Sequence, residues 1–170
     1  SCGVLFHMYD AIKNFAAQFA FKPQIKNAGK LKKYSRFIVA GMGGSHLAAD
    51  LIKVWNPAIA LCIHSDYGLP NIPKEDLRHT LLIASSYSGN TEETLDAFRC
   101  AAKIGLARAV ISVGGELLTS AKKEGIPYVQ LPDTGIQPRS ALGYGFKALL
   151  KLMGPDAALT KVSALVKKLR

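Results

Sequence analysis

At 170 residues the chain is long enough to form one domain with a core of its own. Its three cysteines lie far apart, without the spacing of a disulfide framework or a zinc site, so a reducing, cytoplasmic location is expected. The net charge of +10 comes with no aromatic platform or recognition motif, which argues against a nucleic-acid partner.

Hydrophobic periodicity predicts helices and strands in alternation along the chain. The first element, about residues 9–21, has apolar residues at helical spacing. Its interrupting charges favour an amphipathic helix over a signal peptide or a membrane span. Short apolar runs predict strands at 36–40, 58–64, 80–85, 109–113 and 128–131. Helices are expected after the first strand, where Leu47, Leu51 and Trp55 recur every four residues, and at 91–103, 117–123, 140–153 and 156–169.

Short apolar strands alternating with helices are typical of an α/β fold with a doubly wound parallel sheet, here of five strands flanked by helices. Ligands in such sheets bind beyond the carboxyl ends of the strands. We expect the sheet domain to cover residues 30–153. An N-terminal helix and a tag or processing remnant precede it in residues 1–29, and a further helix follows in residues 154–170.

The segment Ser85-Ser86-Tyr87-Ser88-Gly89-Asn90-Thr91 leads from a predicted strand into a predicted helix. The free N–H groups of a first helical turn and the helix dipole favour an anion at such a place, and the hydroxyl groups add donors. We therefore expect this loop to hold the phosphate group of a small molecule. Asn90 and Glu93 have the spacing of a capping box. The alternative is that the hydroxyl residues serve only as turn and N-cap residues.

A second loop, Gly41-Met42-Gly43-Gly44-Ser45, follows the first strand of the predicted sheet. Alone it matches the start of a dinucleotide fingerprint, with His46 at the position of the third glycine, so a nucleotide-binding Rossmann-like domain is one hypothesis. Two such loops that converge on one phosphate monoester would explain both segments, and this hypothesis is preferred.

These segments resemble the sugar isomerase (SIS) domain, most closely the N-terminal half of bifunctional phosphoglucose/phosphomannose isomerases. The resemblance is carried by residues 41–45 and 86–94 and by Gly135-Ile136-Gln137-Pro138-Arg139-Ser140-Ala141. It implies a flavodoxin-like strand order and a reaction that needs neither metal nor nucleotide cofactor. It also implies that the last helix could link to a second SIS domain beyond the sequence.

The resemblance further implies the roles of individual residues. The sugar phosphate would be held by the hydroxyl groups of Ser45, Ser86, Ser88 and Thr91, and main chain would approach the sugar at Gly43 and Gly44. Arg139 would stabilise the enediolate of an aldose–ketose isomerisation. The family keeps its base in a second SIS domain, so a homodimer or a second SIS domain is the expected partner. The alternative function is a non-catalytic phosphosugar-binding sensor or partner subunit.

Overall fold

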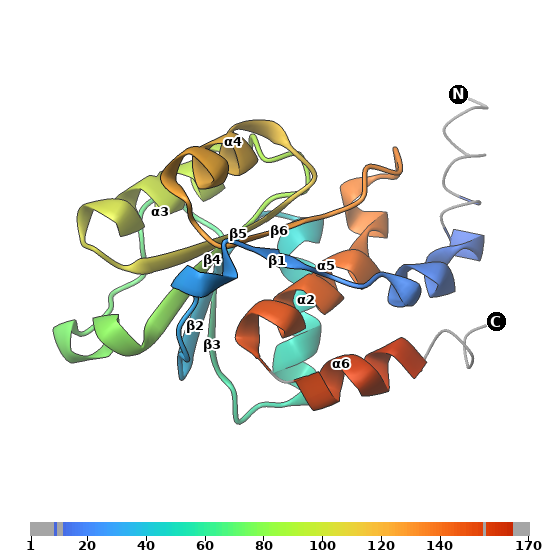
Figure 1. The fold of residues 1–170 in the computed structure, drawn as a ribbon, viewed down its shortest axis with the longest axis horizontal. Coiled ribbons are helices and arrows are strands. Elements are labelled where there is room, and N and C mark those ends of the chain that lie inside the picture. The colour runs from blue at the N-terminus through green and yellow to red at the C-terminus, as the bar shows by residue number, and fades with distance from the viewer. Residues whose placement is uncertain (1–8, 10–11, 155, 165–170) are drawn as a thin grey trace.

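The computed structural model describes residues 9, 12–154 and 156–164, which form an α/β fold around one sheet (Figure 1). The sheet has six strands in the order β1-β6-β5-β4-β2-β3. Their bounds are β1 Ile25–Lys26, β2 Arg36–Ala40, β3 Ala60–His64, β4 Thr80–Ser85, β5 Ala107–Ser112 and β6 Tyr128–Gln130. All five predicted strands are present and mutually parallel, and their order along the sheet is the flavodoxin-like one.

The expected count of five strands is corrected to six, because β1 adds an antiparallel edge strand beside β6. β1 is only two residues long, too short to show a period in the sequence, and it pairs with a strand about a hundred residues away. Phe19, which also precedes residue 30, lies in the main hydrophobic core. Part of the N-terminal segment therefore packs as part of the sheet domain's own core.

Helices cover both faces of the sheet (Figure 1). Their bounds are α2 Gly44–Trp55, α3 Glu92–Lys103, α4 Gly115–Glu124, α5 Leu142–Met153 and α6 Asp156–Ser163, with short 3-10 turns η1 Phe15–Ala20, η2 Ala28–Lys30, η3 Lys74–His79 and η4 Pro138–Ser140. The predicted helices are confirmed, except that the N-terminal one is α-helical only at residues 9, 12 and 13 among those described and becomes a 3-10 helix over Phe15–Ala20. The last part of the helix expected at 156–169 lies outside them. No helix in the described part of the chain is long and apolar enough to cross a bilayer.

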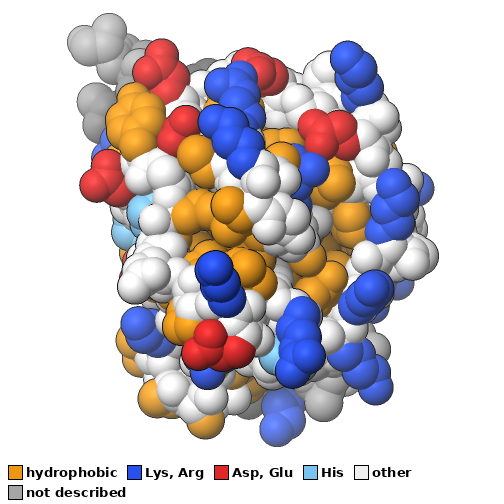
Figure 2. All heavy atoms as spheres, turned by 90° about the vertical axis from the view of Figure 1, so that its left-hand side faces the viewer, with side chains coloured by type: hydrophobic (Ala, Val, Ile, Leu, Met, Phe, Trp, Pro, Cys, Tyr) orange, Lys and Arg blue, Asp and Glu red, His pale blue; other side chains and the backbone are white. Residues whose placement is uncertain are grey.

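The basic residues before the first long strand lie at the amino-terminal edge of the sheet. Arg36 is the first residue of β2 and pairs with Asp76 at 3.1 Å, while Lys30 Nζ donates to the Glu124 carbonyl at the end of α4 at 3.3 Å. The face at the left of Figure 1 carries many Lys and Arg side chains around an apolar patch (Figure 2). The two glycine- and serine-rich loops follow β2 and β4, so they lie at the opposite, carboxyl edge.

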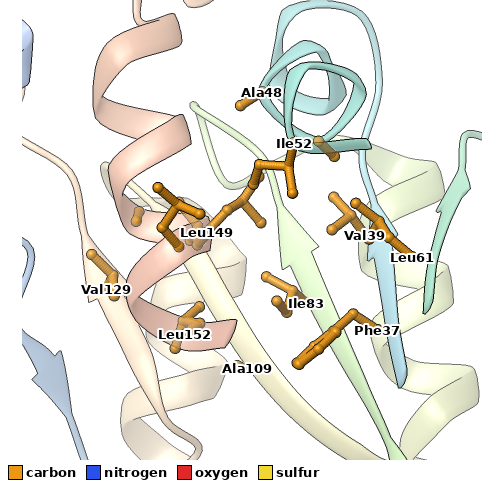
Figure 3. Packing of buried hydrophobic residues seen from close by; sticks show 14 of the residues in the cluster. Phe37, Val39, Ala48, Ile52, Leu61, Ile83, Ala109, Val129, Leu149 and Leu152 are labelled. Atoms are coloured by element: carbon orange, nitrogen blue, oxygen red, sulfur yellow. The ribbon is translucent and has the colours of Figure 1, made fainter. Parts of the chain in front are cut away.

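The core has two layers because successive strand residues point to opposite faces of the sheet. Val39 and Ile83 pack with Leu149 of α5 on one face (Figure 3). Ile38 packs with Phe98 of α3 on the other. α2 packs against the sheet through Ala48, Ala49 and Ile52, which are buried. Its recurring large residues face outward instead, with Leu47 41%, Leu51 43% and Trp55 51% exposed.

Candidate functional site

The structure brings the two predicted loops together at the carboxyl edge of neighbouring strands. β2 and β4 are parallel partners, so the loops that follow them leave the sheet side by side. The Tyr87 N–H donates to Ser45 Oγ at 3.2 Å, and Ser85 Oγ donates to the Ser45 carbonyl at 3.1 Å. Ser45 therefore joins the first loop to the second through both its side chain and its main chain.

The hydroxyl groups of the second loop form a local network. Ser86 Oγ lies 2.8 Å from Thr91 Oγ1 and accepts the Gly89 N–H at 3.1 Å. Ser88 Oγ accepts the Asn90 N–H at 3.2 Å. The Ser86 and Ser88 oxygens accept bonds from the main chain, and between Ser86 and Thr91 one hydroxyl hydrogen is used in the bond that joins them. The remaining hydroxyl hydrogens are available to an anion, which is the donor pattern that a phosphate requires.

The first turn of α3 adds main-chain donors beside these hydroxyl groups. Thr91 is the N-cap residue, and no side chain caps the helix, whose first hydrogen bond runs from Leu95 N to the Thr91 carbonyl at 3.0 Å. The predicted capping box at Asn90 is therefore wrong, because the N-cap is Thr91 and no side chain caps the helix. Asn90 Oδ1 instead accepts the Glu116 N–H of α4 at 2.9 Å. The N–H groups at the start of α3 thus stay available for a ligand.

A third loop, which the sequence did not single out, supports the hydroxyl loop from the side. Gly89 and Gly115 both have left-handed backbone, with φ of 77° and 72°. A Cβ at Gly89 would collide with the Gly114 carbonyl, and one at Gly115 would collide with the Ser88 carbonyl. The Leu117 N–H donates to the Gly89 carbonyl at 3.0 Å. The only signal in the sequence was a pair of glycines after a strand, which carries no side-chain chemistry.

Arg139 lies on η4, which crosses the start of α2. A Cβ at Gly44 would stand 2.6 Å from Arg139 Cα and 2.7 Å from Arg139 N. The missing side chain at Gly44 thus makes room for the main chain that carries Arg139. The Arg139 side chain is exposed and pairs with none of the described residues, whereas the other described arginines contact Asp76, His79, Glu116 and Glu124. Its guanidinium is therefore available to a ligand.

Gly43 is needed for a different reason from Gly44. It has φ 52° and ψ −122°, a conformation that favours glycine, and a Cβ there would meet nothing within 4 Å. The structure thus leaves open space above Gly43, where a ligand could approach the main chain.

Acidic side chains lie on the two helices that begin at the loops, α2 and α3. Glu92 is exposed and accepts a hydrogen bond from the Tyr67 hydroxyl at 3.2 Å. The charge of Glu93, followed by burial and by Glu92, raises the pKa of Tyr67 above its ordinary value. In the first two turns of α2, His46 Nδ1 lies 2.8 Å from Asp50 Oδ2. Within the described part of the chain, no group of three His, Cys, Asp or Glu residues could hold a metal ion.

No protein-family model matches the chain. It is 37% identical over 152 residues to the bifunctional phosphoglucose/phosphomannose isomerase of Caldicellulosiruptor bescii, which is 85% of this chain and 44% of that protein. It is 33% identical to the protein of the same name from Aquifex aeolicus (88% and 46%). It is 30% identical to the D-glucosamine-6-phosphate 4-epimerase of Sulfolobus acidocaldarius (77% and 39%). The chain spans less than half the length of these relatives.

Solved structures share the fold at low sequence identity. The sugar isomerase domain of the RpiR transcription factor from Sphaerobacter thermophilus superposes with a TM-score of 0.56 at 15% identity, over 96% of this chain and 95% of that one. The tagatose-6-phosphate ketose/aldose isomerase of Escherichia coli gives 0.55 at 18% identity, over 84% and 46%.

The chain has the fold of the sugar isomerase domain. It belongs to the family of the bifunctional phosphoglucose/phosphomannose isomerases, as its motifs predicted.

Proposed function

We propose that this chain is the sugar-phosphate-binding part of an aldose–ketose isomerase of the phosphoglucose/phosphomannose type. The observation that carries the proposal is the meeting of two sets of donors. The hydroxyl groups of Ser45, Ser86, Ser88 and Thr91 and the uncapped start of α3 provide a phosphate site at the carboxyl edge. Arg139, which pairs with none of the described residues, is carried by main chain that packs against the same first loop.

The chemistry divides between these two parts. Binding the phosphate would fix one end of the sugar, so that its reacting carbons take a defined position relative to Arg139. Moving a proton between neighbouring carbons of an aldose creates negative charge on the carbonyl oxygen. A fixed guanidinium beside that oxygen stabilises the enediolate more than the starting sugar, which is how such a group accelerates a reaction. The proton itself needs a base, which in this proposal a second SIS domain provides.

An apolar groove supports the proposed partner. Its volume is about 480 Å³, and it is lined by residues of η1, α2, α5 and α6, among them Phe15, Leu51, Val54, Trp55 and Phe146. Val54 is 80% exposed and Trp55 51%. Apolar surface gathered in this way favours association with another protein surface. We therefore propose that a second copy of the chain or a second SIS domain contributes to the complete enzyme.

Isothermal titration with fructose 6-phosphate, glucose 6-phosphate and glucosamine 6-phosphate, together with a coupled isomerase assay on the same sample, tests the proposal. The double variant Ser86→Ala/Ser88→Ala should lose most of the binding, whereas Ser120→Ala on α4 should retain it. Binding without turnover, even in a well-formed dimer, would favour the non-catalytic phosphosugar-binding alternative. Absence of binding to all three sugars would refute the phosphate site itself. Binding of NAD(P) that survives the double variant would point to the nucleotide hypothesis.

A further inference from the structure

Gln18, on the N-terminal turn η1, reaches the segment that carries Arg139. It is a buried polar side chain, only 3% exposed, and it lies more than a hundred residues from its partners in the sequence. Its Nε2 donates to the Ser140 carbonyl at 2.6 Å, and its Oε1 accepts the Gly143 N–H at 2.9 Å. One amide therefore holds both the end of η4 and the start of α5.

The local structure of that segment depends on these two bonds. α5 has no side-chain cap from its own neighbourhood, so Gln18 satisfies one of the N–H groups that a helix start leaves unpaired. Ser140 directly follows Arg139, and its N–H donates to the Gln137 carbonyl at 2.8 Å. A Cβ at Gly143 would stand 2.7 Å from the Gln18 Cβ, so this contact requires glycine there.

A hydrogen bond from Lys147 to the next residue of η1, Phe19, holds the main chain beside Gln18 in place. Lys147 of α5 is 2% exposed, and its Nζ donates to the Phe19 carbonyl at 2.5 Å and to Ser163 Oγ at 2.8 Å. The main chain of η1 is thus fastened to α5 one residue away from the Gln18 amide. The Gln18 amide uses its nitrogen as a donor and its oxygen as an acceptor, so only one orientation of the amide makes both hydrogen bonds. In that orientation Gln18 fixes the position of the turn that carries Arg139.

We propose that Gln18 is a positioning residue for Arg139, and so for recognition of the sugar beyond its phosphate. The inference rests on the proposed function, because it assigns Gln18 a role at that site. The main chain of η4 packs closely against α2 at Gly44, and the Arg139 side chain makes no bond with the described residues that could hold it. On the side of η4 away from α2, Gln18 provides the hydrogen bond to the Ser140 carbonyl. It acts through the main chain and touches no substrate itself.

Four proteins test this role: the wild type, Gln18→Met, Arg139→Met and the double variant. Gln18→Met keeps the length of the side chain and removes both hydrogen bonds, which leaves the Ser140 carbonyl and Gly143 N–H unpaired. We expect fructose 6-phosphate affinity to fall about tenfold, the cost of roughly one such bond. Inorganic phosphate affinity should stay nearly unchanged. In the Arg139→Met background the same substitution should have no further effect on sugar-phosphate binding. Gln24→Met, at an exposed glutamine of the same segment, is the matched control.

A second variant keeps the test open if Gln18→Met folds poorly. In Gln18→Glu the carboxylate still accepts the Gly143 N–H but places a second acceptor against the Ser140 carbonyl. Protonation gives that group an O–H donor and restores both bonds, so its affinity relative to wild type at each pH should recover as the pH falls. A purely steric role would give no such recovery.

The outcomes separate the two proposals. If the wild type binds no sugar phosphate, the proposed function fails and the Gln18 experiment is void with it. If the wild type binds and Gln18→Met binds equally well, the positioning role is refuted. The role is also refuted if the variant loses inorganic phosphate to the same extent, or if the loss persists without Arg139. Hydrogen exchange gives a ligand-free check, because the Gly143 amide should exchange faster in Gln18→Met than in Gln24→Met.

Discussion

Substituting Gly44 by alanine would test directly how the first loop and the Arg139 turn share space. The new Cβ would stand 2.6 Å from Arg139 Cα, 2.7 Å from Arg139 N and 3.0 Å from the carbonyl carbon of Pro138. All three atoms belong to the main chain, so no side chain can rotate away. Carbon atoms pack at roughly 3.5–4.0 Å, so η4 must move outward by about 1 Å.

The expected cost follows from this displacement. Inserting one carbon into a closed contact typically costs about 1–3 kcal/mol, and the gain in helix propensity at the first residue of α2 offsets less than about 1 kcal/mol. A net loss of about 1–2 kcal/mol lowers the melting temperature of a domain of this size by roughly 2–8 °C. Because Arg139 moves with η4, fructose 6-phosphate affinity should fall more than inorganic phosphate affinity.

Thermal unfolding and isothermal titration on the same samples measure both effects. Gly145→Ala is the matched control, since its Cβ would lie 3.6 Å from the Ala48 Cβ, an ordinary contact in the same interface. It should be neutral or stabilising by about 0.5–1 kcal/mol, because alanine is the better helix former. If Gly44→Ala melted at the wild-type temperature and bound sugar phosphate equally well, the close approach of η4 to α2 would be disproved.

Three further comparisons probe the hydroxyl loop and the contact between η1 and α5. In Gly89→Ala the new side chain is strained at φ 77° and also collides with main chain, so the free energy of unfolding in urea should fall by roughly 2–6 kcal/mol. Gly68→Ala has a similar φ of 72° but open space around it, so it should show the cost of the strain alone. Equal losses in the two would contradict the collision. Ser86→Ala should lose stability as well as phosphate binding, since it leaves the Gly89 N–H unpaired, while the exposed Ser88→Ala should lose mainly binding. Equal stability of the two serine variants would refute this difference. Burial, and then the charge of Lys22, lower the pKa of Lys147 from its ordinary value of 10.5. At pH values between the pKa in the folded protein and 10.5, the unfolded chain therefore binds more protons than the folded protein. Wild-type stability relative to Lys147→Met should therefore rise with pH in that window, and pH-independent differences would speak against it.

The parts of the fold that could be predicted are those with a local signal. The parallel strands are continuous apolar runs, and the loop at 85–91 combines hydroxyl residues with a following helix, so both were found from the sequence. Periodicity showed that Leu47, Leu51 and Trp55 share one side of α2, but it could not show which way that side faces. Ala48, Ala49 and Ile52 take the inward side and are buried there.

The candidate site has two parts, the hydroxyl loop and the turn that carries Arg139. They differ in the sequence separation of the residues whose hydrogen bonds hold them. The loop that we propose to hold the phosphate is closed by bonds among residues 86–91, three to five positions apart, and a pattern this local can be recognised in the sequence. The Arg139 end is held by Gln18, which lies 122 residues from Ser140 in the sequence and resembles any other polar residue of an amphipathic segment. Contacts of that kind leave no local pattern. Substitution of Gln18 should therefore alter sugar recognition while leaving phosphate binding nearly intact, although Gln18 lies far from both proposed binding segments in the sequence.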